Sequence, residues 1–176
     1  MMLSVRAALP TPIQSFLQQR DALCALLDSR HTAGLTLARQ HASLADGMLQ
    51  ALFAAALRQR PQGCAPDVLL AAVGGYGRYQ LGWKSDLDVM FVTTAEAAEL
   101  EPFVEAVLYP LWDAGVAIGH QVMRVDHLID TAREALPTAT ALLDFRPLAG
   151  SVRIGELLRE RAWSELFCAE PRAQFV

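Results

Sequence analysis

The sequence predicts an α+β fold in which a small mixed sheet lies between helices that precede and follow it. Three observations support this class. Apolar residues recur at helical spacing in the first third of the chain, short apolar runs of strand length follow, and helical spacing returns in the last third. At 176 residues we expect one domain with a helical extension rather than two independent domains.

Two amphipathic helices are expected in the first third of the chain. Apolar residues recur three, four and seven positions apart between residues 13 and 27, and a similar pattern runs from residue 35 to residue 57. Pro61, Gly63 and Pro66 then interrupt the second pattern. We therefore predict a helical hairpin and assign residues 1–66 to an N-terminal helical extension.

The central part is expected to supply the sheet. Val68 to Val73 and Leu87 to Thr94 are short apolar runs, which predict two buried strands with a glycine-rich turn after the first. A helix from Ala95 to Trp112 follows, and Val116 to Val125 is expected to form a third strand. Residues 67–136 are thus the predicted core of the domain.

The remaining chain is predicted to be helical. Asp126 can cap a helix through Ala135, a second helix is expected from Pro137 to about Leu148, and a last one follows Ser151. We assign residues 137–176 to a C-terminal helical segment packed on the core.

Composition and charge exclude several classes of partner. The formal net charge is -4, from 15 basic and 19 acidic residues, which gives no electrostatic footprint for nucleic acid. No apolar run reaches the roughly 18 residues that a membrane helix needs, and the first ten residues lack a secretory signal. The three cysteines are far apart and outside CxxC spacing, against a disulfide framework or zinc site. We expect a cytoplasmic protein with no nucleic-acid or membrane partner.

The chemistry is concentrated in the stretch AAVGGYGRYQLGWKSDLDVMFV, residues 71–92. Asp86 and Asp88 stand two positions apart at the mouth of a predicted strand, so their carboxylates point to the same face. Two such charges are costly unless they are compensated. Mg²⁺ suits them, because it is typically held by one or two carboxylates and by substrate phosphates. We predict Asp86 and Asp88 as catalytic residues and metal ligands.

The residues around the two carboxylates suit a nucleotide. Gly74 and Gly75 lack a Cβ, so the backbone can turn sharply and present N–H groups to phosphates. Ser85 can add a hydroxyl donor, while Arg78 or Lys84 can offset phosphate charge. The glycines alone favour a plain turn, and the carboxylates alone suit a strand edge as well as a metal. Their combination indicates the nucleotide site, and the spacing fits neither a Rossmann fingerprint nor a P-loop.

The run VGGYGR followed by SDLD resembles the N-terminal nucleotidyltransferase domain of bacterial protein-PII uridylyltransferases, which have a polymerase-β-like fold. The similarity continues through FLQQRDAL before it and through LYPLWDAGVAIGHQVMRV and ATALLDFRPLAGS after it. It implies transfer of UMP from UTP to a tyrosine of the PII signalling protein, with release of pyrophosphate. By the same resemblance, Asp86 and Asp88 bind Mg²⁺.

The sequence departs from that family's pattern at three points. Tyr79 and Gln80 stand where the family usually has Gly-Glu, which places a bulky ring and a neutral amide near the expected pocket. The predicted third strand carries no third carboxylate, and Asp144 matches a helical acidic position. We also expect the HD hydrolase and ACT sensor domains to be lacking. The alternative is therefore a catalytically silent nucleotide-binding or regulatory module of the same fold.

Four further side chains leave alternatives open. Arg124 is expected to contact phosphate or substrate, whereas His120, on the same strand face, either faces the site or satisfies a hydrogen bond in the sheet. Trp83 and Trp112 are expected to pack in the core or a loop, although Trp83 is also placed to cover a uracil ring. The predicted nucleotide-binding residues are Gly74, Gly75, Arg78, Ser85 and Arg124.

Overall fold

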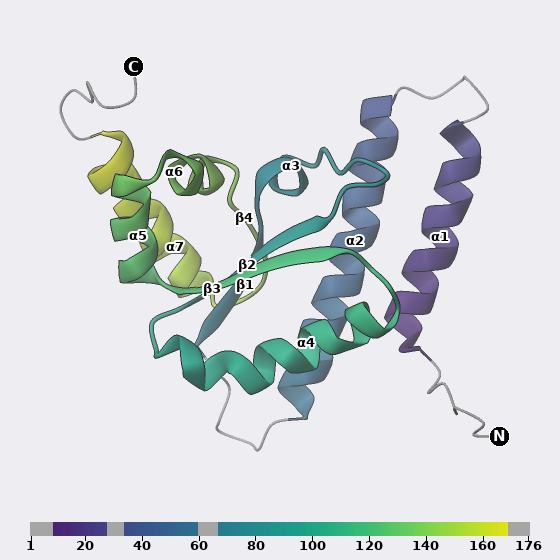
Figure 1. Cartoon of the computed structure of the whole chain (residues 1–176), viewed down its shortest axis with the longest axis horizontal. Coiled ribbons are helices and arrows are strands. Elements are labelled where there is room, and N and C mark those ends of the chain that lie inside the picture. The colour runs from purple at the N-terminus through teal and green to yellow at the C-terminus, as the bar shows by residue number, and fades with distance from the viewer. Residues whose placement is uncertain (1–8, 28–33, 60–66, 169–176) are drawn as a thin grey trace.

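A computed structural model describes residues 9–27, 34–59 and 67–168, and over these residues the chain is a mixture of helices and strands (Figure 1). The predicted α+β class is confirmed, and the arrangement is consistent with a polymerase-β-like fold. The elements are α1 (Thr11–Leu27), α2 (Gly34–Arg58), β1 (Val68–Ala72), α3 (Gly74–Gly77), β2 (Leu87–Thr93), a 3-10 turn η1 (Ala97–Leu100), α4 (Glu101–Asp113), β3 (Ile118–Arg124), α5 (Val125–Glu134), α6 (Leu136–Leu143), β4 (Arg146–Gly150), α7 (Val152–Arg161) and its π-helical continuation η2 (Ala162–Phe167).

The strands form one mixed sheet in the order β3-β2-β1-β4. β1 is antiparallel to both of its neighbours, whereas β2 and β3 run parallel. Every residue of β1 is buried, as expected for a central strand with helices on both faces. The parallel register places Asp88 opposite Gly119 and Thr93 opposite Arg124, so β2 and β3 begin at the same end of the sheet.

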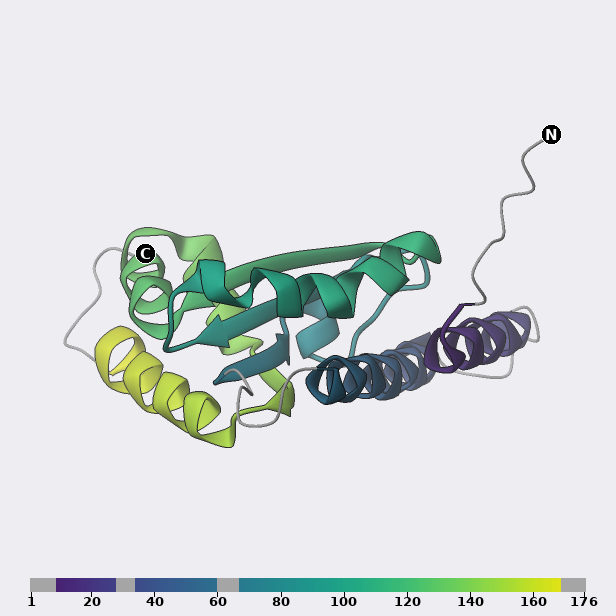
Figure 2. The same cartoon turned by 90° about the horizontal axis from the view of Figure 1, so that it is seen from below.

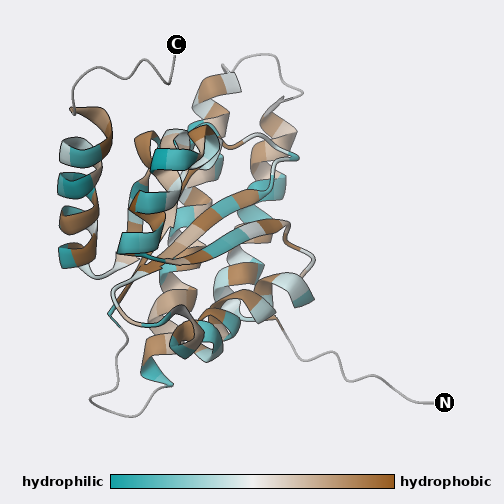
Figure 3. Cartoon of the chain, turned by 60° about the vertical axis from the view of Figure 1, so that its left-hand side comes forward, coloured by the Kyte–Doolittle hydropathy of each residue, from teal (hydrophilic) through white to brown (hydrophobic). Residues whose placement is uncertain are grey.

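Helices cover both faces of the sheet because strand side chains alternate between the two faces. Leu70 and Phe91 pack on one face with apolar residues of α1, α2 and α4. Leu69 and Val92 pack on the other face with α5, α6 and α7. Figures 1 and 2 show α1 and α2 side by side at one end of the molecule and α5 to α7 gathered at the other. Hydrophobic residues run along the central strands, whereas the outer helices alternate with polar residues (Figure 3).

The helical hairpin predicted for the first third is confirmed by the packing of α1 against α2. Residues of α2 at helical spacing, such as Met48, Leu49 and Leu52, are buried against the sheet. None of the helices in the described ranges combines the length with the apolar character that a bilayer crossing requires.

The helix predicted from Pro137 to Leu148 is wrong in its second half. α6 ends at Leu143, and Arg146–Gly150 forms the edge strand β4, which pairs with β1. No local signal marks this strand, because its hydrogen bonds go to a partner far away in the sequence and only Leu148 within it is buried. The sheet therefore includes residues from the predicted C-terminal segment 137–176. The division into segments stays a prediction.

Candidate functional site

Asp86 and Asp88 lie where β2 begins, and both side chains are exposed. Leu87 between them is buried, so the alternation predicted for the two carboxylates holds in the structure. Within the part of the chain that the structure describes, neither carboxylate has an ion pair or a side-chain hydrogen bond. Partial desolvation and the negative charge of Asp86 raise the pKa of the Asp88 carboxyl. The pair is thus an uncompensated negative charge at one end of the sheet.

Two glycines keep the space around the Asp88 carboxylate clear. A Cβ built on Gly119 would lie 2.9 Å from Oδ1 of Asp88, and one built on Gly74 would lie 3.8 Å from Oδ2. Gly74 also has a φ of 58°, a conformation that glycine adopts without a steric penalty. The backbone N–H of Val73 donates to the carbonyl oxygen of Asp88 (3.1 Å), which fixes the start of α3 beside this strand. The carboxylate therefore lies between the glycines of α3 and β3.

The predicted glycine-rich turn forms the short helix α3 and a closed loop. The N–H of Arg78 donates to the carbonyl oxygen of Gly74 (3.2 Å), and that of Gln80 donates to Gly75 (2.8 Å). Tyr79, between them, has a φ of 60°, which residues with a Cβ rarely adopt. The loop thus holds Gly74 and Gly75 next to Asp88.

Ser85, which precedes Asp86 in the sequence, and Arg78 already have contacts of their own. The N–H of Ser85 donates to Gly82 (3.2 Å), and a Cβ on Gly82 would lie 2.6 Å from the Ser85 hydroxyl oxygen. The half-exposed guanidinium of Arg78 forms an ion pair with Asp144. Asp144, considered above as a further carboxylate, is therefore occupied by Arg78.

Arg124 does not join this cluster. It stands opposite Thr93, five residues along β2 from Asp88, which is about 16 Å at the rise of a parallel strand. Its guanidinium pairs with Glu96 and lies 3.8 Å from Asp126. The structure thus places Arg124 at the opposite end of the sheet from the two carboxylates.

Sequence reasoning missed a largely buried ion pair behind α3. The side chains of Asp46 on α2 and Arg146 on β4 are each 15% exposed, and the guanidinium donates to both carboxylate oxygens (2.7 and 3.0 Å). The Tyr76 hydroxyl also donates to Asp46 (2.7 Å), and burial together with the Asp46 charge raises the pKa of Tyr76. Arg146 lies in the run FRPLAGS, but no pattern in the neighbouring sequence predicts its ion pair with Asp46, one hundred residues earlier.

The tryptophans and His120 have packing contacts. The ring of Trp83 lies 5.0 Å from that of His41, which is itself buried against Phe16. Trp112 contacts His120 at 5.7 Å between ring centroids and is partly exposed. Trp83 thus matches the expected packing in a loop, whereas Trp112 lies on the helix α4 with an exposed side chain and contacts the His120 ring.

The residues present fit a metal held jointly with a substrate. Within the described ranges, no group of three or more His, Cys, Asp or Glu side chains is placed to hold a metal ion. Asp86 and Asp88 alone offer two carboxylates and, between Gly74 and Gly119, room for further ligands. Mg²⁺ commonly takes its remaining ligands from water and phosphate oxygens, so this donor set is sufficient.

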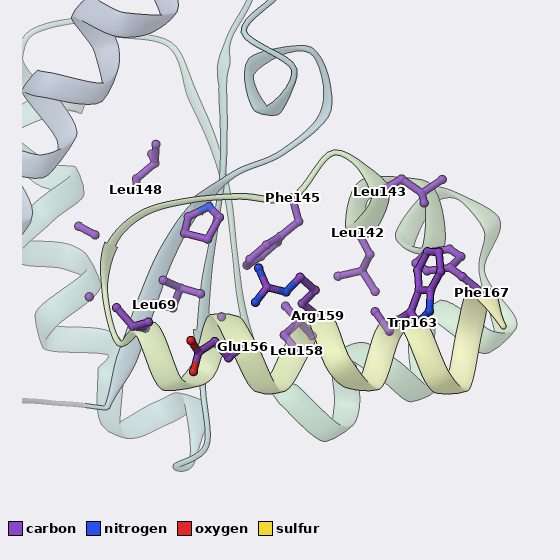
Figure 4. A pocket seen from close by; sticks show the side chains of 16 residues that line it. Leu69, Leu142, Leu143, Phe145, Leu148, Glu156, Leu158, Arg159, Trp163 and Phe167 are labelled. Carbon is purple, nitrogen blue, oxygen red and sulfur yellow. The ribbon is translucent and has the colours of Figure 1, made fainter.

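An apolar hollow of about 560 Å³ lies away from the carboxylates, between α6, β4 and α7 (Figure 4). Leu142, Phe145 and Trp163 line it, and its charged lining residues are Glu156 and Arg159. Neither Asp86 nor Asp88 borders this hollow. We place the candidate site at the carboxylates because phosphate chemistry needs charged and polar groups that converge.

No family model matches the sequence. The chain is similar to proteins named bifunctional uridylyltransferase/uridylyl-removing enzyme. It is 31% identical over 152 residues to one from Novosphingobium aromaticivorans, covering 84% of this chain and 17% of the relative. It is 32% identical to one from Cereibacter sphaeroides (83% and 16% covered) and 36% identical to one from a Bradyrhizobium species (80% and 16% covered). The chain thus spans about one sixth of the length of the curated relatives it matches.

Proposed function

Because this chain is homologous to a domain of the bifunctional uridylyltransferase/uridylyl-removing enzymes, consistent with their N-terminal domain, we propose that it is a magnesium-dependent nucleotidyltransferase. In this proposal it transfers UMP from UTP to a tyrosine of a PII-type signalling protein. The observation that carries the proposal is the uncompensated pair Asp86 and Asp88, framed by Gly74 and Gly119 in a chain with these relatives.

Asp86 and Asp88 are the proposed Mg²⁺ ligands. Partial desolvation and then the negative charge of Asp86 raise the pKa of Asp88, and a divalent cation held with the triphosphate removes the repulsion between the two carboxylates. When bound, Mg²⁺ neutralises phosphate charge and lowers the pKa of a coordinated hydroxyl. The two carboxylates and their clear surroundings are what this chain contributes to that chemistry.

The glycines and Ser85 are the proposed phosphate contacts. As the first residues of a helix, Gly74 and Gly75 have N–H groups that no intrahelical carbonyl accepts. Ser85 directly precedes Asp86, and its exposed side chain offers a hydroxyl donor. Arg78 can reach a phosphate by exchanging the Asp144 carboxylate for a phosphate oxygen. Arg124 is left out of the proposal because it lies at the other end of the sheet.

The proposed reaction exchanges a phosphoanhydride bond of UTP for a phosphate ester of tyrosine. The tyrosine oxygen of the acceptor forms a bond to the α-phosphorus of UTP, the bond from that phosphorus to the bridging oxygen breaks, and pyrophosphate leaves. The phenolic proton passes to solvent. Positioning and charge neutralisation provide most of the rate gain in chemistry of this kind, so the fixed placement of the carboxylates beside the glycine loop is the important feature.

A second candidate is a silent nucleotide-binding module of the same fold. Tyr79 favours it, because its ring occupies the loop where the related family usually has glycine. Both candidates bind the nucleotide, so turnover distinguishes them.

The test is to incubate the native chain with α-labelled UTP, Mg²⁺ and a PII protein, beside the double variant Asp86→Asn/Asp88→Asn. We expect label on the PII tyrosine with the native chain and a loss of more than about 100-fold in the variant, because removing ligands exceeds the effect of removing their supporting contacts. The matched control is Asp126→Asn/Asp130→Asn on α5, which removes equal charge away from the site.

Each result selects one interpretation. Transfer that survives in the double variant would contradict the role of the two carboxylates. UTP binding without transfer would favour the silent module, and absence of UTP binding would reject the nucleotide site.

A further inference from the structure

The largely buried ion pair of Asp46 and Arg146 joins three segments that are distant in the sequence. Asp46 lies in α2, Arg146 opens β4, and both contact α3 through Tyr76. The guanidinium forms a two-bonded fork with the carboxylate, at 2.7 and 3.0 Å. This geometry holds both side chains in one orientation, which a single point charge does not.

The other donors of Arg146 bind the end of α3. Nε donates to the carbonyl oxygen of Gly77 (3.1 Å), and Nη2 donates to that of Tyr76 (3.2 Å). Both carbonyls lie at the C-terminus of a helix, where they lack intrahelical partners. The Tyr76 carbonyl also accepts from the N–H of Tyr79 (3.1 Å), so Arg146 adds a second donor there and supplies one to Gly77. A Cβ on Gly77 would also collide with the carbonyl oxygen of Asp144, so α3 is pressed against the segment that leads into β4. Arg146 therefore fixes where α3 ends.

Tyr79 covers the ion pair on its outer side. The centre of the Arg146 guanidinium lies 3.7 Å from the centroid of the Tyr79 ring, a stacked cation–π contact. Tyr79 takes a positive φ although it has a side chain, and the stacking compensates that unfavourable backbone conformation. The next residue closes the loop, since the N–H of Gln80 donates to Gly75. The Tyr79 side chain is thus one of the contacts that determine the conformation of the loop.

From these contacts we infer that Arg146 and Asp46 are positioning residues, which hold α3 so that Gly74 and Gly75 stay beside Asp88 and receive the nucleotide phosphates. The inference rests on the proposed function, because it assigns the ion pair a role in that site. Arg146 acts through the backbone of α3 and does not touch the reacting groups. A purely structural role would instead make the pair important for global stability alone.

The first arm of the test measures the loop without any ligand. In Arg146→Lys the charge and the pairing with Asp46 can persist, but one ammonium cannot bind the carboxylate and both carbonyls in the same geometry. We expect hydrogen exchange at the amides of Gly77, Arg78 and Gln80 to become at least about 10-fold faster. The control is Leu128→Ala, buried on the opposite face of the sheet, with denaturant adjusted so that both variants have equal global stability. Amides of β1 should then exchange alike in the two variants.

The second arm measures binding of UTP in the presence of Mg²⁺ by the native chain and by both variants. We expect the dissociation constant to rise at least about 10-fold in Arg146→Lys and to stay within about 2-fold of the native value in Leu128→Ala. Tyr79→Gly, which removes the stacked ring, should fall between them.

The two arms separate failure of this inference from failure of the proposed function. Exchange in the loop that matches the Leu128→Ala control would overturn the positioning role, and so would fast exchange with unchanged UTP binding. If the native chain did not bind UTP at all, the proposed function would fail. The role in the nucleotide site would fail with it, even if the exchange arm still showed that Arg146 orders the loop.

Discussion

Both ends of the sheet carry ion pairs, but the end where β2 begins also carries two carboxylates that have no cationic partner among the described residues. Where β2 ends, Arg124 pairs with Glu96, and Arg153 pairs with Asp67 just before β1. Where β2 begins, Asp86 and Asp88 have no cationic partner among the described residues, and the pKa of Asp88 is raised. Protein charges are usually compensated, so a close pair of like charges in a cleared space indicates a site for an external cation. The difference locates the candidate site more securely than the positions of its arginines.

The largest expected difference in stability between the two ends comes from their ion pairs. Asp46→Asn leaves the guanidinium of Arg146 mostly buried and without its negatively charged partner. We therefore expect a loss of about 3 kcal/mol in the free energy of unfolding. Arg153→Gln breaks an exposed pair at the far end, and we expect less than about 1 kcal/mol. Urea unfolding of both variants measures the difference, and equal losses would show that the two ion pairs contribute alike to stability.

A smaller effect is expected from filling the space beside Asp88. Gly119→Ala places a Cβ 2.9 Å from Oδ1 of Asp88, so the carboxylate must shift while the strand remains intact. We expect UTP with Mg²⁺ to bind about 10-fold more weakly, with little loss of stability. The control is Gly47→Ala on α2, where no atom lies within 4 Å of the added Cβ and we expect a gain of up to about 1 kcal/mol. Unchanged binding by Gly119→Ala would show that the carboxylate does not need this space.

The smallest effect should come from the other end of the sheet. Arg124→Gln removes the contacts with Glu96 and Asp126, both of them exposed. We expect binding and transfer to change by less than about 2-fold, because exposed pairs contribute little and the residue lies far from Asp88. Titration with UTP and Mg²⁺ checks this. A 10-fold weaker complex would restore the original expectation that Arg124 contacts the nucleotide.

Much of the fold was predictable because its signals are local. α1 and α2 have strong helical periodicity, and β1 and β2 are short apolar runs on either side of the glycines. Asp86, Asp88 and the two glycines also lie within one short stretch, so strand alternation alone brings the carboxylates to one face. These parts of the candidate site are encoded by neighbours in the sequence.

The parts that were missed depend on partners far along the chain. β4 is defined by its pairing with β1, and the role of Arg146 depends on its ion pair with Asp46, one hundred residues earlier. Strand alternation places Arg124 on the same face as His120, but it does not tell which end of β3 lies beside Asp88. The register shows that this is the first end of β3, at Ile118 and Gly119. Local pattern therefore predicts side-chain direction, whereas position along a strand requires the sheet register.

We propose above all that Asp86 and Asp88 form a cation-binding site, and the stability of Asp88→Asn tests this most directly. A raised pKa means that the folded state favours the protonated carboxyl over the ionised one. The stabilisation that Asp88 gives is therefore present below the unfolded pKa and is lost as the pH rises through the folded pKa. At neutral pH the native pair therefore repels. Without ligand, Asp88→Asn should unfold at a higher temperature than the native chain. The gain in the free energy of unfolding should be less than about 1 kcal/mol because the group is exposed.

The measurement is thermal unfolding of the native chain and of Asp88→Asn, with and without UTP and Mg²⁺. At a ligand concentration about 100-fold above the dissociation constant, we expect roughly 2.7 kcal/mol of stabilisation for the native chain and almost none for the variant, so the order of the two midpoints reverses. If Asp88→Asn were less stable without ligand and gained as much from UTP and Mg²⁺ as the native chain, the carboxylates would not form the cation site.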